Sequence, residues 1–306
     1  MNMYSTKFKM LPSTGVLLSR LSIIGLCMLL VSFPEHAIAG TIRHDVSDSS
    51  YTVLATAYDS VGKLNIGAGM ASGVLIHENW VLTAAIPLSS APLGTTVEFI
   101  IGGLSYSMDS LFTPVYGDGF DLALLKLATP ATGVNPALLY TGAGELGSLG
   151  TAVGYGFTGT GLTGATNHTT VKRAGTNMID EIDGSGIMWA DFDRPSFPGE
   201  SSLGSATPTS LEYLFANGDI GGGLFIEEGG KTYLAGIHSV IDYHDGFNDS
   251  DYGDKMGSTK VSLYVEDFIN PFIDDPSSSS VPEPTTMLLL GTGLLGLAGA
   301  RRRFKR

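Results

Sequence analysis

The chain has 306 residues, of which 43% are hydrophobic and only 15% are charged, so it can bury a sizeable core and is not disordered as a whole. Its formal net charge of −13 argues against nucleic-acid binding, because that surface needs a basic stripe. The 41 glycines favour many tight turns and so a β-rich chain, and the one cysteine, Cys27, excludes an internal disulfide and a cysteine metal site.

Residues 1–39 are typical of a secretory signal peptide. A basic start is followed by a short apolar run at 21–31, and Ala37 and Ala39 place small residues before a cut at Gly40. The apolar run is too short for the ~20 residues of a spanning helix, so cleavage is favoured over a membrane anchor. Cys27 would leave with this segment, and the exported chain would be free of cysteine.

The middle of the chain contains many short segments that look like strands, separated by turns rich in glycine. They are residues 51–58, 72–76, 80–84, 96–101, 121–127, 150–156, 169–179, 187–191, 224–226, 232–241 and 259–265. Only residues 266–273 look helical, and Pro271 disturbs that segment. The pattern shows no βαβ alternation and no clear repeat, so it predicts a barrel or a sandwich.

Residues 40–281 are strongly acidic, with 9 Lys and Arg against 28 Asp and Glu and hence a formal charge of −19. Such a surface stays soluble and repels anionic polymers. Within it, the stretch 242–254 offers Asp245, Asp249 and Asp251 as candidate calcium ligands, since Ca²⁺ takes several carboxylate and carbonyl oxygens. The EF-hand spacing with its distal Glu is absent, so a solvated acidic loop is favoured. We therefore expect no cofactor, with calcium as the open alternative.

The C-terminus has three parts in order. Residues 275–284 form a Ser/Pro linker that ends in Pro-Glu-Pro, residues 285–300 are apolar with glycine interruptions, and basic residues close the chain at 301–306. This order resembles the PEP-CTERM sorting signal of Gram-negative bacteria, in which 285–306 is the hydrophobic helix and basic tail. The resemblance implies an exosortase that recognises and cuts the tail, transient membrane association, and a place at the cell surface or in the extracellular matrix. A plain tail anchor is the alternative.

Five segments of the middle, in order over roughly residues 42–272, together resemble the trypsin-like serine peptidases of the S1 family. They are residues 71–85, 121–127, 151–156, 218–237 and 257–262. The resemblance implies an all-β fold over residues 40–274. It consists of two packed six-stranded antiparallel β-barrels with a cleft between them, followed by a short C-terminal helix.

The resemblance fails at two of the three catalytic positions. Ile86 stands where the family has the histidine of Thr-Ala-Ala-His, and Ile220 stands where it has the serine of Gly-Asp-Ser-Gly-Gly. Only the carboxylate that orients the histidine is kept, at Asp121. An isoleucine can neither accept a proton nor attack a carbonyl. Loss of the serine or the histidine alone costs about 10⁶ in kcat, or roughly 8 kcal/mol.

Other parts of the family's machinery remain in the sequence. The backbone N–H groups of Gly218 and Ile220 would form the oxyanion hole, which would bind a carbonyl without chemistry. Asp219 would pair with an amine freed at Gly40 by signal cleavage, and the equal alternative is that it caps a turn. Asp121 without a histidine would need other donors or a raised pKa, and Thr83 is one candidate donor.

No other side chain is expected to replace the missing base or nucleophile. His77 lies at the far end of a strand from Ile86, and His238 follows the strand that lines the substrate pocket in the family. A surface or hydrogen-bonded histidine is the default interpretation of both. Residues 199–202, Gly-Glu-Ser-Ser, echo a nucleophile turn but lie in a loop rich in Pro, Ser and Gly.

We therefore expect an exported, surface-sorted peptidase homologue without a working triad, which acts as a binding or extracellular-matrix module for a peptide or a surface polymer. One alternative is an active serine-type endopeptidase with displaced catalytic residues, which needs a Ser-, His- or Lys-based arrangement in the cleft. A second is a structural component of an exopolysaccharide or biofilm matrix, and that alternative rests on the tail alone.

Overall fold

The computed structural model describes residues 40–112, 121–167 and 171–273. These residues belong to one of the two units into which the chain divides, Ala37–Arg306. The predicted signal peptide, linker and sorting tail, at 1–39, 275–284 and 285–306, lie outside the described residues. In the part of the chain that is described, no helix is long and apolar enough to cross a membrane.

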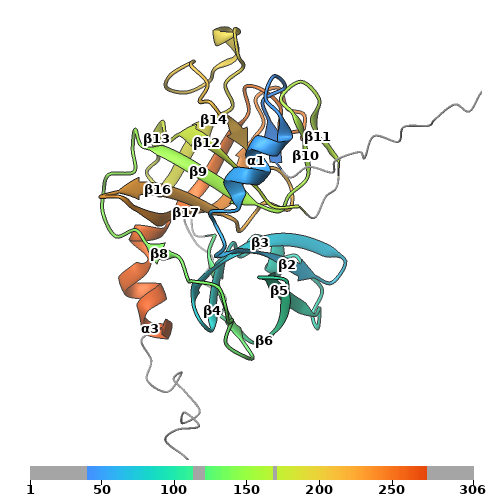
Figure 1. Cartoon of the computed structure of the whole chain (residues 1–306), viewed down its shortest axis with the longest axis vertical. Helices are drawn as coiled ribbons and strands as arrows, with labels where there is room; N and C mark the ends of the chain where they lie inside the picture. The colour runs from blue at the N-terminus through green and yellow to red at the C-terminus, as the bar shows by residue number, and fades with distance from the viewer. Residues whose placement is uncertain (1–39, 113–120, 168–170, 274–306) are drawn as a thin grey trace, which may run out of the picture. The chain divides into compact units, whose positions relative to one another are not determined.

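The first half of the described chain forms a closed six-stranded β-barrel (Figure 1). Around the barrel its strands are β2 (Val61–Ile66), β3 (Gly69–His77), β4 (Trp80–Thr83), β7 (Ala123–Leu127), β6 (Leu104–Phe112) and β5 (Val97–Ile101). Alternate side chains of a strand point inward, and Leu64, Phe99 and Leu125 are fully buried there. The Phe99 ring fills the interior so tightly that a Cβ on Gly62 would lie 2.5 Å from it.

The second half forms an eight-stranded curved sheet that stays open on one side. Its strands, in order, are β12 (Arg173–Met178), β9 (Leu149–Gly154), β16 (Gly223–Glu228), β17 (Lys231–Asp242), β18 (Lys255–Lys260), β14 (Ile187–Asp191) and β13 (Glu181–Ile182), and β8 (Leu138–Leu139) pairs with β17. No backbone ladder between described residues joins β12 to β14, but the Asn177 side-chain amide donates to the Asp191 carbonyl at 2.6 Å. The predicted all-β fold of two packed barrels is confirmed, with the second barrel a half-barrel.

A smaller four-stranded sheet brings the beginning of the described chain to the second barrel. Its strands, in order, are β11 (Gly164–Asn167), β10 (Thr158–Thr160), β1 (Gly40–Ile42) and β15 (Tyr213–Leu214). Strand β1 runs parallel to β10 and antiparallel to β15. Gly40 is therefore held beside the segment that leads into the predicted nucleophile loop.

Residues 51–58 do not form the predicted strand, because helix α1 (Asp48–Ala55) covers most of them. Ser47 caps this helix by accepting a hydrogen bond from the Ser49 N–H. Tyr51 and Ala55 lie one turn apart and are both buried, and α1 packs against β12 (Figure 1). Burial of one helical face here outweighs the strand propensity of the β-branched and aromatic residues.

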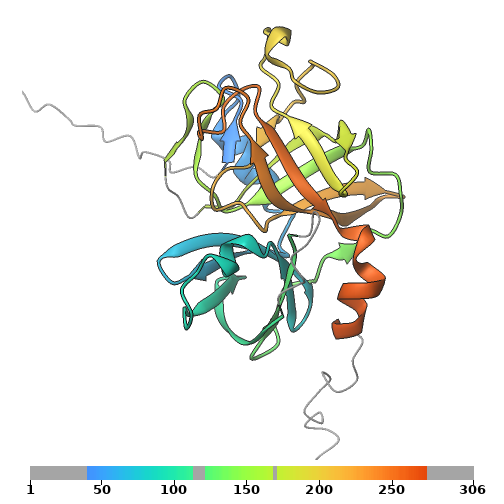
Figure 2. The same ribbon diagram turned by 180° about the vertical axis from the view of Figure 1, so that it is seen from behind.

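The predicted strand at 259–265 is wrong over most of its length, because β18 already ends at Lys260. A 3₁₀ turn (Val261–Leu263), a π-helical turn (Val265–Ile269) and α3 (Asn270–Ile273) follow it. Pro271 stands in the first turn of α3, directly after the π-helical turn. Figure 2 shows this C-terminal helix beside the first barrel, where Phe272 lies 5.8 Å from Trp80 between ring centres. The short C-terminal helix is confirmed.

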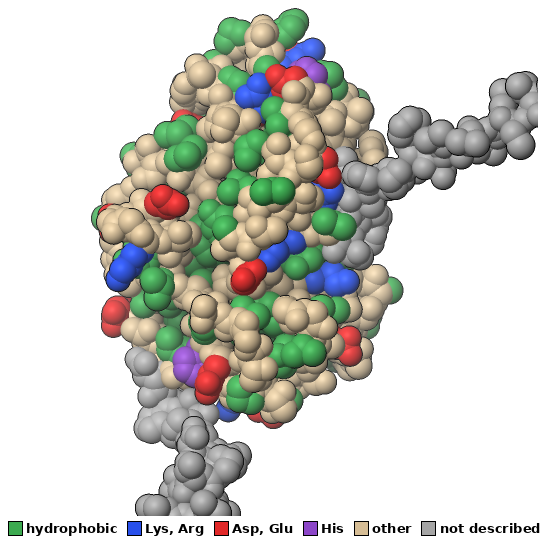
Figure 3. All heavy atoms as spheres, viewed as in Figure 1, with side chains coloured by type: hydrophobic (Ala, Val, Ile, Leu, Met, Phe, Trp, Pro, Cys, Tyr) green, Lys and Arg blue, Asp and Glu red, His purple; other side chains and the backbone are tan. Residues whose placement is uncertain are grey.

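Three groups of buried apolar residues hold the unit together, one inside each barrel and one between the barrels. The group between them includes Val74 and Leu82 of the first barrel and Phe225 and Ile237 of the second. Ile220 packs at the edge of both the inter-barrel group and the second-barrel group. On the face in Figure 3, charged side chains are scattered singly or in small groups of mixed sign among apolar and other residues. The two barrels thus meet through apolar contacts, and Ile220 lies where they meet.

Candidate functional site

A cavity of about 610 Å³ opens between the two barrels at the predicted catalytic positions. The first barrel and the helix that follows β4 supply Met70, Ile86 and Pro87, and the second barrel supplies residues including Ile220 and Val240. A second cavity of about 500 Å³ continues along the first barrel and shares Met70 and Pro87 with the first. None of the described residues that line either cavity is charged, although the chain as a whole is acidic.

The structure brings Ile86 and Ile220 to the same cavity, as the resemblance implied for the residues that they replace. Ile86 begins the short helix α2 (Ile86–Ser89) and leaves 48% of its surface exposed. Ile220 lies in the turn before β16 and is half-buried. Two aliphatic side chains therefore stand where a base and a nucleophile would have to stand, and neither can transfer a proton.

Asp121 is buried and accepts three hydrogen bonds in place of a histidine. Its Oδ1 accepts from the backbone N–H groups of Ala85 and Ile86, each at 2.8 Å, and its Oδ2 accepts from the Ser239 hydroxyl at 2.7 Å. Burial raises the pKa of Asp121 above its usual value, although these donors act in the opposite direction. The carboxylate thus caps α2 and is satisfied without the imidazole.

The expectation that Thr83 donates to Asp121 is wrong. The Thr83 hydroxyl donates instead to the Ser72 carbonyl at 2.7 Å. Ser239, which no sequence motif singles out, takes the donor role, because β17 passes beside Asp121 only in the folded chain. The next residues of that strand, Val240 and Ile241, line the cavity.

The loop at 217–222 presents two backbone N–H groups that no acceptor among the described residues takes. Within the loop, the N–H of Asp219 donates to Ala216 and that of Gly222 donates to Asp219. The N–H groups of Gly218 and Ile220 have no such bond, and both residues line the cavity. This is the arrangement that suits a carbonyl oxygen of a ligand.

Ser72 of β3 fixes this loop to the first barrel, a role that sequence reasoning missed. Its hydroxyl donates to the Gly218 carbonyl at 3.0 Å and accepts from the Tyr155 N–H at 2.9 Å. Its own N–H donates to the Ile220 carbonyl at 2.9 Å. The approach is so close at Gly221, whose φ is 86°, that a Cβ there would lie 2.3 Å from the Ser72 carbonyl oxygen. The loop is therefore clamped at Gly218 and Ile220, the two cavity-lining residues whose N–H groups lack an acceptor among the described residues.

Asp219 is completely buried behind the loop. Its Oδ1 accepts from the Gly156 N–H at 2.6 Å and its Oδ2 from the Ala216 N–H at 2.9 Å, so it caps the turn that begins at Ala216. Burial raises the pKa of Asp219 to about 7. Gly40 packs on the Tyr213 ring, whose own pKa the Asp219 charge helps to raise. Gly40 and Asp219 thus share Tyr213 as a neighbour, and pairing of Asp219 with a freed Gly40 amine stays a prediction.

The two histidines considered as replacements do not line the cavity. His238 is completely buried behind the loop, 3.1 Å from the Ser258 hydroxyl through Nδ1 and stacked on Phe215 at 4.5 Å between ring centres. Burial lowers the pKa of His238 to about 3, so it is neutral at physiological pH. His77 is the last residue of β3, at the opposite end of the β3–β4 hairpin from Ile86.

The acidic stretch at 242–254 brings three carboxylates together. Carboxylate oxygens of Asp249, Asp251 and Asp254 lie within 4.8 Å of one another, whereas Asp245 is not in this group and accepts from the Phe247 N–H. Asp254 also accepts from the backbone N–H groups of His244 and Asp251, as an acidic residue does when it shapes a loop. Calcium binding at Asp245, Asp249 and Asp251 stays an untested alternative to the predicted solvated loop.

The comparisons with known proteins agree with this geometry. The family model described as Trypsin matches residues 52–269, and the model described as the PEP-CTERM protein-sorting motif matches residues 280–303. A solved structure of HL collagenase is similar in fold, with a TM-score of 0.52 and 17% sequence identity, and the match covers 80% of this chain and 100% of that one. No curated protein matches the chain significantly. The sorting motif indicates export, surface sorting and recognition by an exosortase-type system.

Proposed function

Because this chain belongs to the trypsin family but has isoleucine at two of the family's three catalytic positions, we propose that it binds peptides in its cleft without cleaving them. The observation that carries the proposal is that Ile86 and Ile220 line the same cavity. The Asp121 carboxylate beside them keeps its hydrogen bonds, and the N–H groups of Gly218 and Ile220 have no acceptor among the described residues. A site that had simply decayed would not be expected to keep its clamps and its free amides together.

The cleft offers three features that suit an extended peptide. Gly218 and Ile220 line the cavity, and their N–H groups, which have no acceptor among the described residues, would take a backbone carbonyl. Strand β17 pairs with β16 only as far as Ile237. Beyond that residue β17 pairs with β18 on one side, and its other edge has no strand partner among the described residues. An extended peptide can add to such an edge through main-chain hydrogen bonds, and the apolar cavity walls would hold its side chains.

The sorting motif, which indicates export and surface sorting, supports a role for the protein outside the cell. We infer that a Gram-negative cell exports the protein, that the tail holds it transiently in the membrane, and that it then acts as a binding module of the cell surface or matrix. A purely structural role in a surface polymer has the sorting motif as its only support.

An active peptidase with a displaced nucleophile is the second candidate, and one observation favours it. The Ser239 hydroxyl lies 2.7 Å from the Asp121 carboxylate, and Ser239 lines the cavity. Against this, Ser239 is 7% exposed, and its hydroxyl bonds directly to the carboxylate with no histidine between them to take its proton as a base.

The test treats the exported protein with a fluorophosphonate label and with fluorescent casein. We expect no labelled residue and no turnover. A labelled serine that disappears in Ser239→Ala would establish the second candidate and overturn the proposal. The matched control is Ser262→Ala, because Ser262 bonds to Glu145, away from the residues that line the cavity.

A further inference from the structure

The loop at 217–222 contains the only Asn-Gly pair in the sequence, Asn217 followed by Gly218. Every other asparagine of the chain is followed by a residue that carries a side chain. Asn217 is exposed, and both residues of the pair line the cavity between the two barrels. The Asn-Gly pair therefore stands in the wall of the proposed binding site, and its chemistry decides what that wall offers to a ligand.

An Asn-Gly pair can react with itself. The backbone nitrogen of Gly218 attacks the side-chain carbonyl carbon Cγ of Asn217, and the bond from Cγ to the side-chain nitrogen breaks. That nitrogen leaves as ammonia and takes with it the proton of the Gly218 N–H, so a cyclic succinimide remains. Water then hydrolyses one of the two ring C–N bonds and leaves an aspartate or an isoaspartate at position 217. The attack is intramolecular, and glycine has no Cβ to obstruct it.

The structure leaves both reacting groups available. The Gly218 N–H donates to no acceptor among the described residues, so the nitrogen has no hydrogen bond to lose before it attacks. The Asn217 side-chain amide has no hydrogen bond to another described residue that would hold it away from the backbone. Asn217 is also open to the water that the second step consumes. The pair can therefore react in the folded protein.

Hydrogen bonds hold the chain on both sides of this pair. The Asn217 carbonyl accepts from the Phe157 N–H at 2.6 Å, and the Gly218 carbonyl accepts from the Ser72 hydroxyl at 3.0 Å. In an isoaspartate the main chain runs through Cβ and Cγ, which places one more carbon between these two anchors. That extra carbon would displace the Gly218 N–H from its place in the cavity wall or break one of the two bonds.

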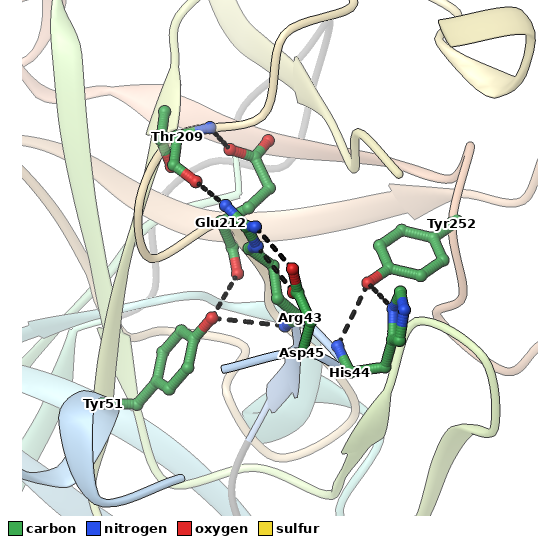
Figure 4. A network of polar contacts seen from close by, with 7 residues as sticks. All are labelled: Arg43, His44, Asp45, Tyr51, Thr209, Glu212 and Tyr252. Carbon is green, nitrogen blue, oxygen red and sulfur yellow. Dashed lines mark hydrogen bonds and ion pairs between the residues drawn. The ribbon is translucent and has the colours of Figure 1, made fainter. Parts of the chain in front are cut away.

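The segment that leads into the loop cannot take up this extra length, because its own backbone is tied down (Figure 4). The Arg43 guanidinium donates to the Thr209 carbonyl at 2.8 Å, and the Tyr51 hydroxyl donates to the Glu212 carbonyl at 3.2 Å. Beyond Glu212, residues 213–216 are completely buried. The change is therefore confined to the loop and to the cavity that it lines.

Both products carry a charge that the cavity otherwise lacks. None of the described residues that line this cavity or its neighbour along the first barrel is charged. A carboxylate at position 217 would have no cation in the described wall to pair with, so it would favour a ligand that brings one. The unreacted amide has no such preference.

We propose that Asn217 and Gly218 form a modification site at which the exported protein deamidates with age, so that an uncharged cleft becomes an anionic one. The site stands on the Asn-Gly pair and the hydrogen bonds of its loop, whereas its effect on a ligand rests on the proposed function. The new protein takes apolar peptides, and the aged protein selects peptides that carry a lysine or an arginine.

The first test ages the folded exported protein at pH 8 and 37 °C and follows each asparagine by peptide mapping and mass spectrometry. We expect the Asn217 amide to convert to an acid at least about tenfold faster than that of Asn248, an exposed asparagine followed by Asp249. Base should speed the conversion, because the Gly218 nitrogen attacks after it loses its proton. Conversion at Asn217 that is no faster than at Asn248, or that appears only once the protein has melted, would overturn the proposal.

The second test measures the affinity of peptides that differ only by a lysine in place of a neutral residue. Asn217→Asp carries the charge from the start, and we expect it to bind the lysine peptide at least about fivefold more tightly than the unmodified protein does. Asn248→Asp is the matched control, because it adds the same charge outside the residues that line the cavities. An equal gain in both variants, or a gain in neither, would overturn the effect on the ligand. If no peptide binds while Asn217 still converts, the proposed function fails and the modification site stands.

Discussion

Asp121, just before β7 of the first barrel, and Asp193, just after β14 of the second, are both buried carboxylates, yet their surroundings differ. Asp121 receives three hydrogen bonds, two from amides and one from a hydroxyl. Asp193 has an oxygen without a partner among the described residues and lies near other acids. The contrast shows that a buried carboxylate need not lack hydrogen bonds when its catalytic histidine is absent, because nearby backbone and hydroxyl donors can satisfy it. A carboxylate that lacks such donors becomes sensitive to pH instead.

The largest effect is expected when the histidine and serine of the family are restored beside Asp121. We expect Ile86→His with Ile220→Ser to raise peptide hydrolysis at least about 10³-fold over the unmodified protein, because a base, a nucleophile and an orienting carboxylate would meet at one cavity. Initial rates with a fluorogenic peptide panel measure the gain. Ile86→His alone is the control and should stay inactive, and equal activity of the two variants would show that the serine position is not the one assigned.

Substitution of Asp121 and of Asp193 should change the free energy of unfolding in opposite directions. Asp121→Asn should lower the free energy of unfolding by about 2 to 4 kcal/mol, because an amide offers one acceptor oxygen and brings donors that face donors. Asp193→Asn at pH 8.5 should raise it by about 1 kcal/mol, because it removes a buried charge that has no counter-ion. Chemical denaturation at both pH 6 and pH 8.5 measures the difference. The comparison fails if the two variants change stability in the same direction at pH 8.5.

A smaller effect is expected at the clamp between the barrels. Ser72→Ala removes the hydrogen bonds to the Gly218 carbonyl and from the Tyr155 N–H, so it should lower the free energy of unfolding by about 1 to 2 kcal/mol. It should also raise hydrogen exchange at 217–222. Thr52→Ala, which removes an exposed hydroxyl on α1, is the control and should change stability by less than about 0.5 kcal/mol. Unchanged hydrogen exchange at 217–222 in Ser72→Ala would mean that Ser72 does not position the N–H groups of Gly218 and Ile220.

Sequence patterns predicted the features that depend on local order. Strands such as β14 and β17 contain runs of apolar residues bounded by turns, and the catalytic positions lie within short motifs, so the sequence alone singles out Ile86, Ile220 and Asp121. Helix α1 was not predicted, because its strand-forming residues are overruled by burial of one face. Strands β2 and β6 were also missed, although β6 alternates apolar with polar residues as a half-buried strand does.

Contacts between distant segments could not be predicted in this way. The Ser239 donor to Asp121 and the Ser72 clamp join residues more than a hundred positions apart. Asp193 is buried just after β14, and nothing in the sequence distinguishes it from the exposed acids of this chain. Charge and burial are set by the fold here, so their consequences for pH appear only in the structure.

The central claim, that the cleft binds peptides and leaves them intact, is tested most directly by one binding measurement with recovery of the ligand. A panel of labelled apolar peptides is titrated with the exported protein by fluorescence anisotropy, and each bound peptide is then recovered and weighed by mass spectrometry. We predict saturable binding that is lost in Ile220→Lys, with every peptide recovered at its original mass. Recovery of cleaved peptides, or binding that is unchanged in Ile220→Lys, would contradict the account.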